Sequence, residues 1–325
     1  MRITVLDTFT AFLPGEARPA GLSELGEVNW IEETDASRTA ERIGLSDAVI
    51  CNKSRMTREV MEQCPRLQYI GLMGTGFDQV DLTAAAEHGI TVCNVPAYSA
   101  NAVAQHTFAL ILNHYCRIAD YARDCADGGW TEKRYFSEFG LPTHELAGKT
   151  IGLAGYGHIG RKVGEIARAF DMEVLAYTRH PERYAPYDKP AVTFVPLRTL
   201  LKKSDIVSLH CPLNSETHCL INRDTLSLMK PTALLVNTAR GGLINEADLA
   251  HALRSGIIAA AAVDVLTEEP MSVTTPLRQA PHITVTPHIA WAPLETRRRL
   301  FDIVCDNLRC WMEGHPQNVV CPVKD

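Results

Sequence analysis

Three ionisable side chains in the second half of the chain could do chemistry together: Arg240, Glu269 and His288. Each follows a short apolar run that is typical of a buried strand. If these runs are parallel strands of one sheet, their carboxyl ends open onto one crevice, where side chains far apart in sequence can converge. The three runs are residues 233–236, 259–263 and 283–285.

The residue types suit the reduction of a 2-keto acid. A guanidinium binds a carboxylate through two parallel hydrogen bonds, which is a role for Arg240. An imidazole titrates near neutral pH, so His288 can deliver a proton as a hydride arrives, and Glu269 can favour the protonated ring. From placement alone, a surface arginine, a solvated glutamate and a core or capping histidine explain the same pattern.

A glycine-rich turn supplies the second chemical signal. The sequence GYGHIG at 155–160 lies between a predicted strand and a predicted helix, and in that context G-x-G-x-x-G is typical of dinucleotide binding. Gly155 permits the tight turn, Gly157 lets the backbone approach a pyrophosphate, and Gly160 lets helix and strand pack closely. Free N–H groups at the helix start would bind the anion. A glycine-rich turn without a ligand is the alternative.

The end of the next predicted strand, 174–177, bears on the choice of cofactor. About 20 residues past the first glycine, an NAD-specific site usually has an acid that binds the ribose hydroxyls. This chain has Thr178 and Arg179 there. An arginine can pair with a 2′-phosphate, and the missing carboxylate removes a repulsion, so NADP is favoured over NAD. The alternative is a solvated Arg179 that stacks on adenine.

These residues need a scaffold of parallel strands and covering helices. Short β-type runs alternate with helical patterns along most of the chain, which is the signature of α/β layers. In the first part, helices are expected after Thr57 and after Asp81. The predicted strands of this first series are residues 3–6, 48–51, 69–73 and 90–95.

A second series of strands follows a long helix, which is predicted from Asn101 to about Arg123 with Asn101 as its N-cap. Each crossover in this series is long enough for a helix or a helical turn, so right-handed connections and a doubly wound sheet follow. A last amphipathic helix is predicted from Leu294 to about Glu313. The predicted strands of the second series are residues 150–154, 174–177, 206–209, 233–236, 259–263 and 283–285.

Bulk properties fit a globular protein of about two domains. The chain has 325 residues, of which 46% are hydrophobic and 22% charged. The net charge is -6 without a Lys/Arg stripe, so nucleic-acid binding is not expected. No apolar run approaches the ~20 residues of a membrane-spanning helix, and no secretion signal is visible. The 10 cysteines are scattered without zinc spacing, so reduced thiols, no metal and a cytoplasmic location are expected.

Four motifs in order resemble the D-isomer-specific 2-hydroxyacid dehydrogenase family. They are the GYGHIG turn, NTARGG at 237–242, DVLTEEP at 264–270 and TPHIAW at 286–291. The resemblance covers nearly the whole chain and implies an α/β fold with two doubly wound parallel-sheet domains. A Rossmann cofactor domain, 101–292, would be inserted in a flavodoxin-like substrate domain, 1–100 and 293–325. The resemblance also implies a homodimer formed through the cofactor domains.

By this resemblance the protein would reduce a small, anionic 2-keto acid to the D-2-hydroxy acid. Arg240 would bind the substrate, His288 would be the acid–base, and Glu269 its partner. Backbone N–H groups of Met73, Gly74, Thr75 and Gly76 would bind the substrate carboxylate, because glycines let the chain come close. Asp264 would hold the nicotinamide carboxamide. The other residues expected to line the cofactor are Gly155, Tyr156, Gly157, His158, Ile159, Gly160, Thr178, Arg179, His210, Cys211, Pro212, Thr217, Thr238 and Ala239.

Finer motif detail points to one branch of the family. The string QHTFAL at 105–110 and Trp291 resemble glycerate dehydrogenases, also called hydroxypyruvate reductases, so hydroxypyruvate or glyoxylate is the expected substrate. A short D-3-phosphoglycerate dehydrogenase is one alternative; Lys53, Arg55 and Arg58 could bind its phosphate or merely solvate the surface. A non-catalytic regulator that senses the dinucleotide is another, but it would not need the three catalytic candidates.

Overall fold

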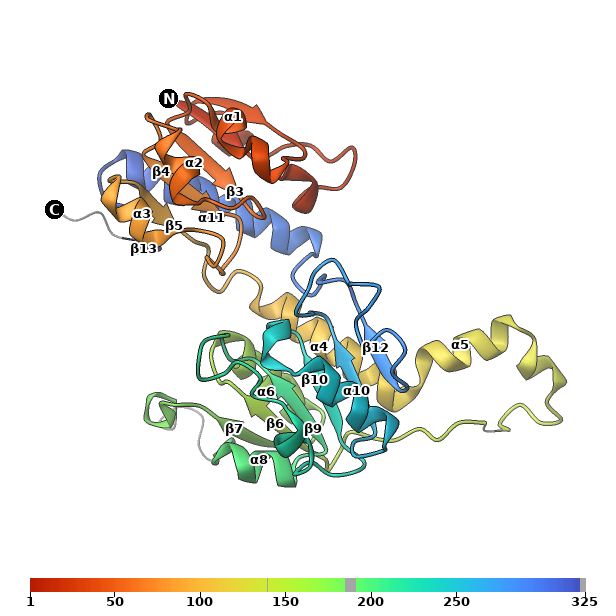
Figure 1. Ribbon diagram of the computed structural model, residues 1–325. Helices are drawn as coiled ribbons and strands as arrows, with labels where there is room; N and C mark the ends of the chain where they lie inside the picture. Colours follow the sequence, from red (N-terminus) through yellow and green to blue (C-terminus); the bar gives the residue numbers. More distant parts are fainter. Residues whose placement is uncertain (139, 185–190, 322–325) are drawn as a thin grey trace. The chain divides into compact units, whose positions relative to one another are not determined.

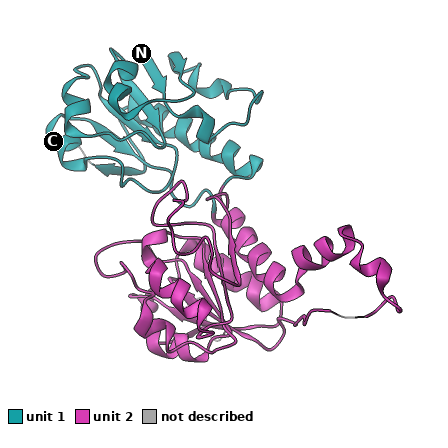
Figure 2. Ribbon diagram, turned by 45° about the vertical axis from the view of Figure 1, so that its right-hand side comes forward, with its two compact units in different colours: residues 1–99, 292–325 teal, residues 100–291 magenta. Residues whose placement is uncertain are grey.

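The computed structural model describes residues 1–138, 140–184 and 191–321 of a chain that divides into two compact units. Unit 1 consists of Met1–Ser99 and Ala292–Asp325, and unit 2 of Ala100–Trp291 (Figure 2). Figure 1 labels most of the helices and strands of both units. No helix among the described residues is both long and apolar enough to cross a membrane.

Unit 1 is built on one six-stranded sheet. Its strands are β1 (Arg2–Val5), β2 (Glu27–Trp30), β3 (Ala48–Cys51), β4 (Tyr69–Leu72), β5 (Thr91–Cys93) and β13 (Val319–Cys321). Their order is β13-β5-β4-β3-β1-β2, with β13 antiparallel to β5 and the other pairs parallel. The order 2-1-3-4-5 of the parallel strands is flavodoxin-like and confirms the predicted fold class.

The helices of unit 1 are α1 (Thr39–Ile43), α2 (Arg58–Glu62), α3 (Leu82–Glu87) and α11 (Leu294–Met312). Two of them begin at capping side chains: Thr57 accepts from the Val60 N–H before α2, and Asp81 accepts from the Ala84 N–H before α3. These bonds satisfy N–H groups that a helix start leaves unpaired. The long helix α11 contacts the sheet at β4, and Phe301 on it is fully buried.

Unit 2 is built on one seven-stranded sheet in which every pair is parallel. Its strands are β6 (Thr150–Ala154), β7 (Glu173–Tyr177), β8 (Thr193–Phe194), β9 (Ile206–Leu209), β10 (Leu234–Asn237), β11 (Ala260–Val263) and β12 (Ile283–Val285). Their order is β12-β11-β10-β9-β6-β7-β8. Counted within the unit, this is the 3-2-1-4-5-6 order of the Rossmann fold with a seventh strand added at one edge.

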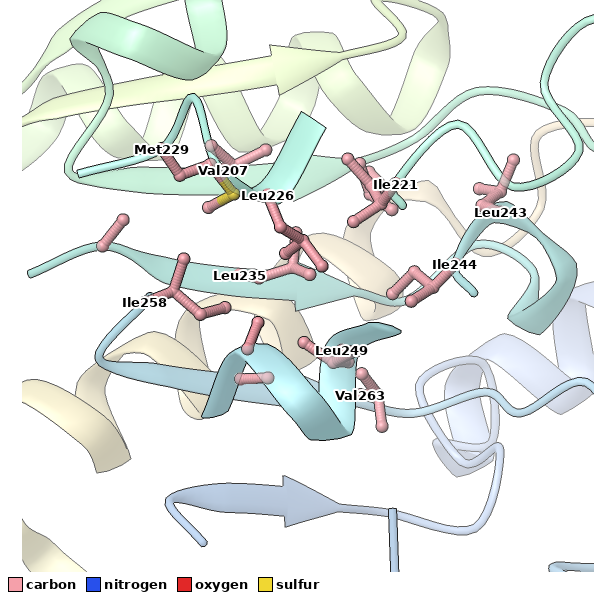
Figure 3. Close-up of a cluster of buried hydrophobic side chains, with 14 of the residues drawn as sticks. Val207, Ile221, Leu226, Met229, Leu235, Leu243, Ile244, Leu249, Ile258 and Val263 are labelled. Atoms are coloured by element: carbon pink, nitrogen blue, oxygen red, sulfur yellow. The ribbon is translucent and has the colours of Figure 1, made fainter. Parts of the chain in front are cut away.

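Helices cover both faces of the unit 2 sheet. They are α4 (Ala100–Cys116), α6 (His158–Ala169), α8 (Leu197–Lys203), α9 (Arg223–Leu226) and α10 (Glu246–Arg254). A further helix, α5 (Ile118–Ala126), has no buried residue. Successive side chains of a strand point to opposite faces, so Leu235 joins one apolar cluster while Leu234 and Val236 join the other. Residues of α8, α9 and α10 close the first cluster, and residues of α4 and α6 close the second. Figure 3 shows part of the first cluster, with Leu226 of α9 and Leu249 of α10 labelled.

The structure corrects the sequence prediction at three strands and one helix. Strands β2, β8 and β13 were not predicted. Because β8 belongs to the second sheet, that sheet has seven strands and not the expected six. All three lie at sheet edges, where a short and partly exposed strand carries no continuous apolar run. The prediction of a single helix from Asn101 is wrong. Two helices, α4 and α5, occupy this region, because Arg117 between them has a left-handed φ of 54°. Since α4 begins at Ala100, Asn101 lies in its first turn and is not the N-cap.

Candidate active site

The carboxyl ends of six neighbouring strands of unit 2 lie side by side in one row. The residues that the register aligns are, in sheet order, Val285, Val263, Asn237, Leu209, Ala154 and Tyr177. Every residue of unit 2 that the sequence predicts to bind cofactor or substrate belongs to a segment that follows one of them. The register of the sheet thus gathers at one edge residues that are far apart in sequence.

The turn after β6 has the geometry of a phosphate-binding turn. Gly155 has a φ of 104°, and a Cβ there would lie 2.4 Å from the nitrogen of Cys211. A Cβ on Gly160 would lie 2.3 Å from the Gly155 carbonyl oxygen, so α6 packs directly on the turn. At Gly157, by contrast, no non-neighbouring described atom lies within 4 Å of a Cβ. The start of α6 at His158, whose first N–H groups lack partners within the helix, therefore borders open space on the side where a pyrophosphate is expected.

The side chain of Tyr156 belongs to the core, and that of Ile159 packs against it. Tyr156 is 3% exposed and meets the rings of Tyr184 and Phe194 edge to face, with centroids 5.6 and 5.3 Å apart. Ile159 packs against the same apolar cluster, whereas His158 is exposed. The buried ring of Tyr156 leaves its backbone as the part that can face a cofactor, and a contact of the half-buried Ile159 with the cofactor stays a prediction.

Arg179, just beyond β7, forms an ion pair that the sequence did not indicate. Its Nη2 lies 2.5 Å from Oε2 of Glu216, and the two side chains are 54% and 69% exposed. Thr178 precedes it and is half-buried. The guanidinium therefore lies at the strand end where the ribose of a dinucleotide is expected, but a carboxylate of the loop after β9 holds it.

The loop after β9 is held by its own polar groups. Burial lowers the pKa of His210 to about 4, so its ring is neutral at pH 7. Burial raises the pKa of the Cys211 thiol, which stays protonated. The hydroxyl of Thr217 donates to the Pro212 carbonyl oxygen at 2.6 Å and accepts from the Asn214 N–H at 2.8 Å. Thr217 therefore shapes the loop, and the loop contacts the glycine turn at His210 and Cys211.

A hydrogen-bonded turn presents Arg240. Asn237, at the end of β10, accepts from the Ala239 N–H at 3.0 Å and donates to the Arg240 carbonyl oxygen at 2.9 Å. Thr238 is buried, and its hydroxyl lies 3.2 Å from that of Thr107 on α4. These bonds fix the backbone of the turn. The half-buried guanidinium of Arg240 donates to the Ala239 carbonyl oxygen at 2.8 Å.

Gly241 places the Arg240 turn against the loop that carries Glu269. A Cβ on Gly241 would lie 1.9 Å from the carbonyl carbon of Leu266, so only glycine permits this approach. Leu266 in turn donates its N–H to Oε1 of Glu269 at 3.1 Å. The two segments that carry Arg240 and Glu269 are therefore in direct backbone contact.

His288 and Glu269 form a hydrogen bond of 2.7 Å between Nδ1 and Oε2. Both side chains are 31% exposed. Because an ionised carboxylate only accepts hydrogen bonds, Nδ1 of His288 is the donor. Nε2 is then the ring nitrogen that can exchange a proton with a bound substrate, and Glu269 fixes the direction in which it points.

Asp264 has partners that the sequence did not predict. Its side chain has no exposed surface. Oδ1 accepts from the Thr286 hydroxyl at 2.5 Å and from the Ile289 N–H at 3.0 Å, and Oδ2 accepts from the Ala290 N–H at 2.8 Å. Donors of the chain itself engage both oxygens, and the contact of Asp264 with a nicotinamide carboxamide stays a prediction.

The predicted substrate loop belongs to unit 1 and follows β4. The N–H of Met73 donates to the Cys51 carbonyl oxygen at 2.9 Å, so Met73 cannot serve as predicted. The N–H groups of Gly74, Thr75 and Gly76 have no acceptor among the described residues. Asn94 donates to the Thr75 carbonyl oxygen at 2.7 Å. This bond holds the carbonyl oxygen on the side of Asn94, opposite to the N–H group of the same peptide. Three successive amides in such a loop suit a carboxylate.

Sequence reasoning missed the polar side chains that hold these loops. Two of these residues, His106 and Thr107, interrupt the apolar pattern of the helix predicted after Asn101, and this interruption was a usable signal. The others lie in loops and pair with partners that are far away in sequence, so the local sequence gives no signal for them. No group of three or more His, Cys, Asp or Glu side chains that could hold a metal occurs within the described part of the chain. The missed residues are Asn94, His106, Thr107, Glu216 and Thr286.

A doubly wound sheet with a dinucleotide turn and an acid–base pair at its carboxyl edge is typical of nicotinamide-dependent oxidoreductases. Residues 108–290 match the family model described as D-isomer specific 2-hydroxyacid dehydrogenase, NAD binding domain. The chain is 39% identical to a hydroxypyruvate reductase of Blautia hydrogenotrophica, over 98% of this chain and 99% of that protein. It is 36% identical to a glycerate dehydrogenase of Methylorubrum extorquens, over 95% and 98%.

A crystal structure of a Thermus thermophilus protein has the same fold, with a TM-score of 0.87 and 36% identity over 98% of this chain and 100% of that chain. The chain belongs to the D-isomer-specific 2-hydroxyacid dehydrogenase family. It is therefore an oxidoreductase that uses a nicotinamide dinucleotide and acts on 2-hydroxy or 2-keto acids.

Gly157→Ala is expected to weaken dinucleotide binding by about tenfold or more while leaving the unfolding temperature unchanged. The added methyl group meets no atom of the protein but enters the space beside the start of α6. Calorimetric titration with NADPH and NADH, together with thermal unfolding, checks this. Gly164→Ala, within α6, is the control, because its Cβ makes only ordinary contacts of 3.4 to 3.6 Å with Leu153, Tyr156 and Val174. Equal affinity of Gly157→Ala and the wild type would contradict the assignment of the turn.

Proposed function

We propose that the enzyme reduces a small 2-keto acid, hydroxypyruvate or glyoxylate, to the D-2-hydroxy acid. The observation that carries the proposal is the 2.7 Å hydrogen bond between His288 and Glu269 at the carboxyl edge of the dinucleotide-binding sheet. A proton donor on that edge meets the needs of carbonyl reduction and has no task in a pure sensor of the dinucleotide. The similarity to a hydroxypyruvate reductase and a glycerate dehydrogenase supports these substrates.

Each polar group has one task in this reaction. Arg240 binds the substrate through its forked guanidinium. His288 holds a proton at Nε2 and delivers it to the carbonyl oxygen, while Glu269 holds the ring through Nδ1. When bound, the nicotinamide supplies a hydride to the carbonyl carbon. The N–H groups of 74–76 bind the substrate carboxylate, so unit 1 acts as the substrate domain and unit 2 as the cofactor domain.

NADPH is proposed as the preferred cofactor because of Arg179. No acid stands at the end of β7 to repel a 2′-phosphate. The ion pair with Glu216 opposes this choice only weakly, since exposed pairs contribute about 0.2–1 kcal/mol. A phosphate carries more charge than the carboxylate and accepts the guanidinium fork, so it can replace Glu216.

A phosphorylated substrate is less well supported. A cavity of about 370 Å³ in unit 1 is lined by two arginines, and Arg58 already pairs with Glu87 at 2.6 Å. Three acids line the same cavity, so it does not offer the excess positive charge that a phosphate dianion needs. The charged lining residues are Arg55, Arg58, Glu59, Asp78 and Asp81.

A homodimer formed through unit 2 accounts for an exposed apolar arm. Helix α5 has no buried residue, and the segment after it exposes Trp130, Tyr135 and Phe136, the last by 87%. Figure 1 shows α5 and this segment extending away from the sheet of unit 2. Clustered apolar surface of this kind typically marks an interaction site, and a second copy of the chain is the proposed partner.

His288→Ala is expected to lower kcat by at least about 100-fold while leaving NADPH affinity nearly unchanged, because general acids typically contribute 10²–10⁴-fold. Arg240→Lys is also expected to be severe, since a point charge does not replace the fork. The assay follows loss of reduced cofactor with hydroxypyruvate, glyoxylate, pyruvate and phosphohydroxypyruvate.

The control for these variants is His251→Ala, an exposed position on α10 that should keep full activity. If the wild type consumes no reduced cofactor with any of the keto acids, the proposed reaction is wrong. Retention of more than about a tenth of kcat in His288→Ala would remove His288 as the proton donor.

Arg179→Ala is expected to lower kcat/KM for NADPH by about 10- to 100-fold and to leave the value for NADH within about threefold, because a charge-assisted bond to the 2′-phosphate is lost. Glu216→Gln should raise kcat/KM for NADPH, since it frees the guanidinium. Steady-state kinetics with both cofactors measures the two effects. An equal loss with NADH and NADPH in Arg179→Ala would assign this side chain to adenine stacking instead.

Phe136→Glu is expected to shift the wild-type dimer towards monomer, because a buried carboxylate opposes burial of the arm. Sedimentation equilibrium over a range of protein concentrations measures the change. Leu45→Glu, at an equally apolar and 56% exposed position of unit 1, is the control and should remain dimeric. A monomeric wild type at micromolar concentration would rule out the proposed assembly.

A further inference from the structure

The segment after β12 holds His288 in an unusual backbone conformation. Its φ is 55°, in the left-handed region that residues other than glycine rarely adopt. A strained backbone at a functional position persists only where surrounding contacts determine it. The contacts that determine the conformation of His288 also determine where its proton is delivered.

Asp264 supplies those contacts. Its carbonyl oxygen accepts from the His288 N–H at 2.8 Å. Its carboxylate accepts from the Ile289 N–H at 3.0 Å and from the Ala290 N–H at 2.8 Å. Three consecutive amides therefore donate to one residue. Asp264 fixes the backbone on which the imidazole stands, as Glu269 fixes the ring at Nδ1.

The carboxylate of Asp264 stays charged although it is fully buried. Burial raises its pKa, but hydrogen bonds from His106, Thr286 and the amides of 289–290 outweigh burial and leave the pKa below its ordinary value. A buried carboxylate is tolerated only when its oxygens are satisfied. The donors outside the His288 segment therefore decide whether Asp264 stays in place.

The available hydrogens fix which group donates and which accepts at each hydrogen bond between His106, Thr286 and Asp264. The hydroxyl of Thr286 has a single hydrogen, which it donates to Oδ1 of Asp264. Nε2 of His106 lies 3.0 Å from the same hydroxyl oxygen and must be its donor, so this ring carries a hydrogen on Nε2. Nε2 also lies 3.5 Å from Oδ1 of Asp264. The network therefore runs from α4 through the end of β12 to the end of β11.

We propose that His106 and Thr286 are positioning residues for His288 and act through Asp264. The inference rests on the proposed role of His288 as proton donor. Without the Thr286 hydroxyl, Oδ1 of Asp264 loses its shortest side-chain donor and keeps only the longer contact with His106, and the carboxylate can move away from the amides of 289–290. The His288 backbone can then leave its left-handed conformation, and Nε2 is displaced from the carbonyl oxygen. Small displacements of this kind are costly for proton transfer.

The test compares Thr286→Val, which keeps the shape but removes the hydroxyl, with Thr286→Ser, which keeps the hydroxyl. Thr286→Val is expected to slow single-turnover reduction of the keto acid by about 10- to 100-fold, with the dissociation constant for NADPH within about twofold. Thr286→Ser should retain most of the rate. His106→Phe should act like Thr286→Val but more weakly, because Thr286 still donates to Asp264.

The matched control is Thr284→Val, two residues earlier on β12, where the hydroxyl makes no hydrogen bond with a described residue. A second control combines Thr286→Val with His288→Ala. If Thr286 acts only through His288, the double variant is no slower than His288→Ala alone.

Amide hydrogen exchange of the peptide that spans 288–290 gives a readout that does not depend on catalysis. Exchange should be faster in Thr286→Val than in the wild type, and unchanged in Thr286→Ser and Thr284→Val. Unchanged exchange or an unchanged rate in Thr286→Val would overturn the inference, as would additive losses in the double variant. A wild type that reduces no keto acid would instead refute the proposed function, and the exchange data would still show whether the network holds the segment.

Discussion

The chemistry of unit 2 depends on the register of its parallel sheet. The aligned strand ends bring the glycine turn, the Arg240 turn and the His288 segment to one edge. Slippage of a strand by one residue would turn every one of its side chains to the other face. The alternation that buries Leu235 on one side and Leu234 on the other therefore also sets the position of the loop that follows. The same strand register thus determines both the packing of the core and the position of the site.

Backbone contacts convert that alignment into a fixed site. Gly155 contacts the loop after β9, Gly160 contacts the turn itself, and Gly241 contacts the loop that leads to Glu269. In each case a side chain would force the two segments apart. Loops that touch through their backbones have little freedom to move independently, which favours the precise placement that proton and hydride transfer need.

The sequence allowed prediction of features that have a local physical signature. Central strands such as β10 are buried on both faces and appear as apolar runs, and the glycine turn follows from short-range geometry. The edge strand β8 has no such run, and a left-handed residue such as Arg117 leaves no mark on a helical pattern. The partners of Asp264 could not be predicted, because its contacts with the segment after β12 arise only when two strands take their register and α4 packs beside them.

All groups proposed to handle the proton belong to unit 2. Glu269, Asp264 and the network from His106 hold His288 through contacts within that unit, so its orientation is set when unit 2 folds. The amides proposed to bind the carboxylate belong to unit 1 and are held there by Asn94. By this proposal, changes in the unit 1 loop alter which 2-keto acid is accepted without disturbing the proton donor. A division of this kind explains how one scaffold can serve several related substrates with a single acid–base arrangement.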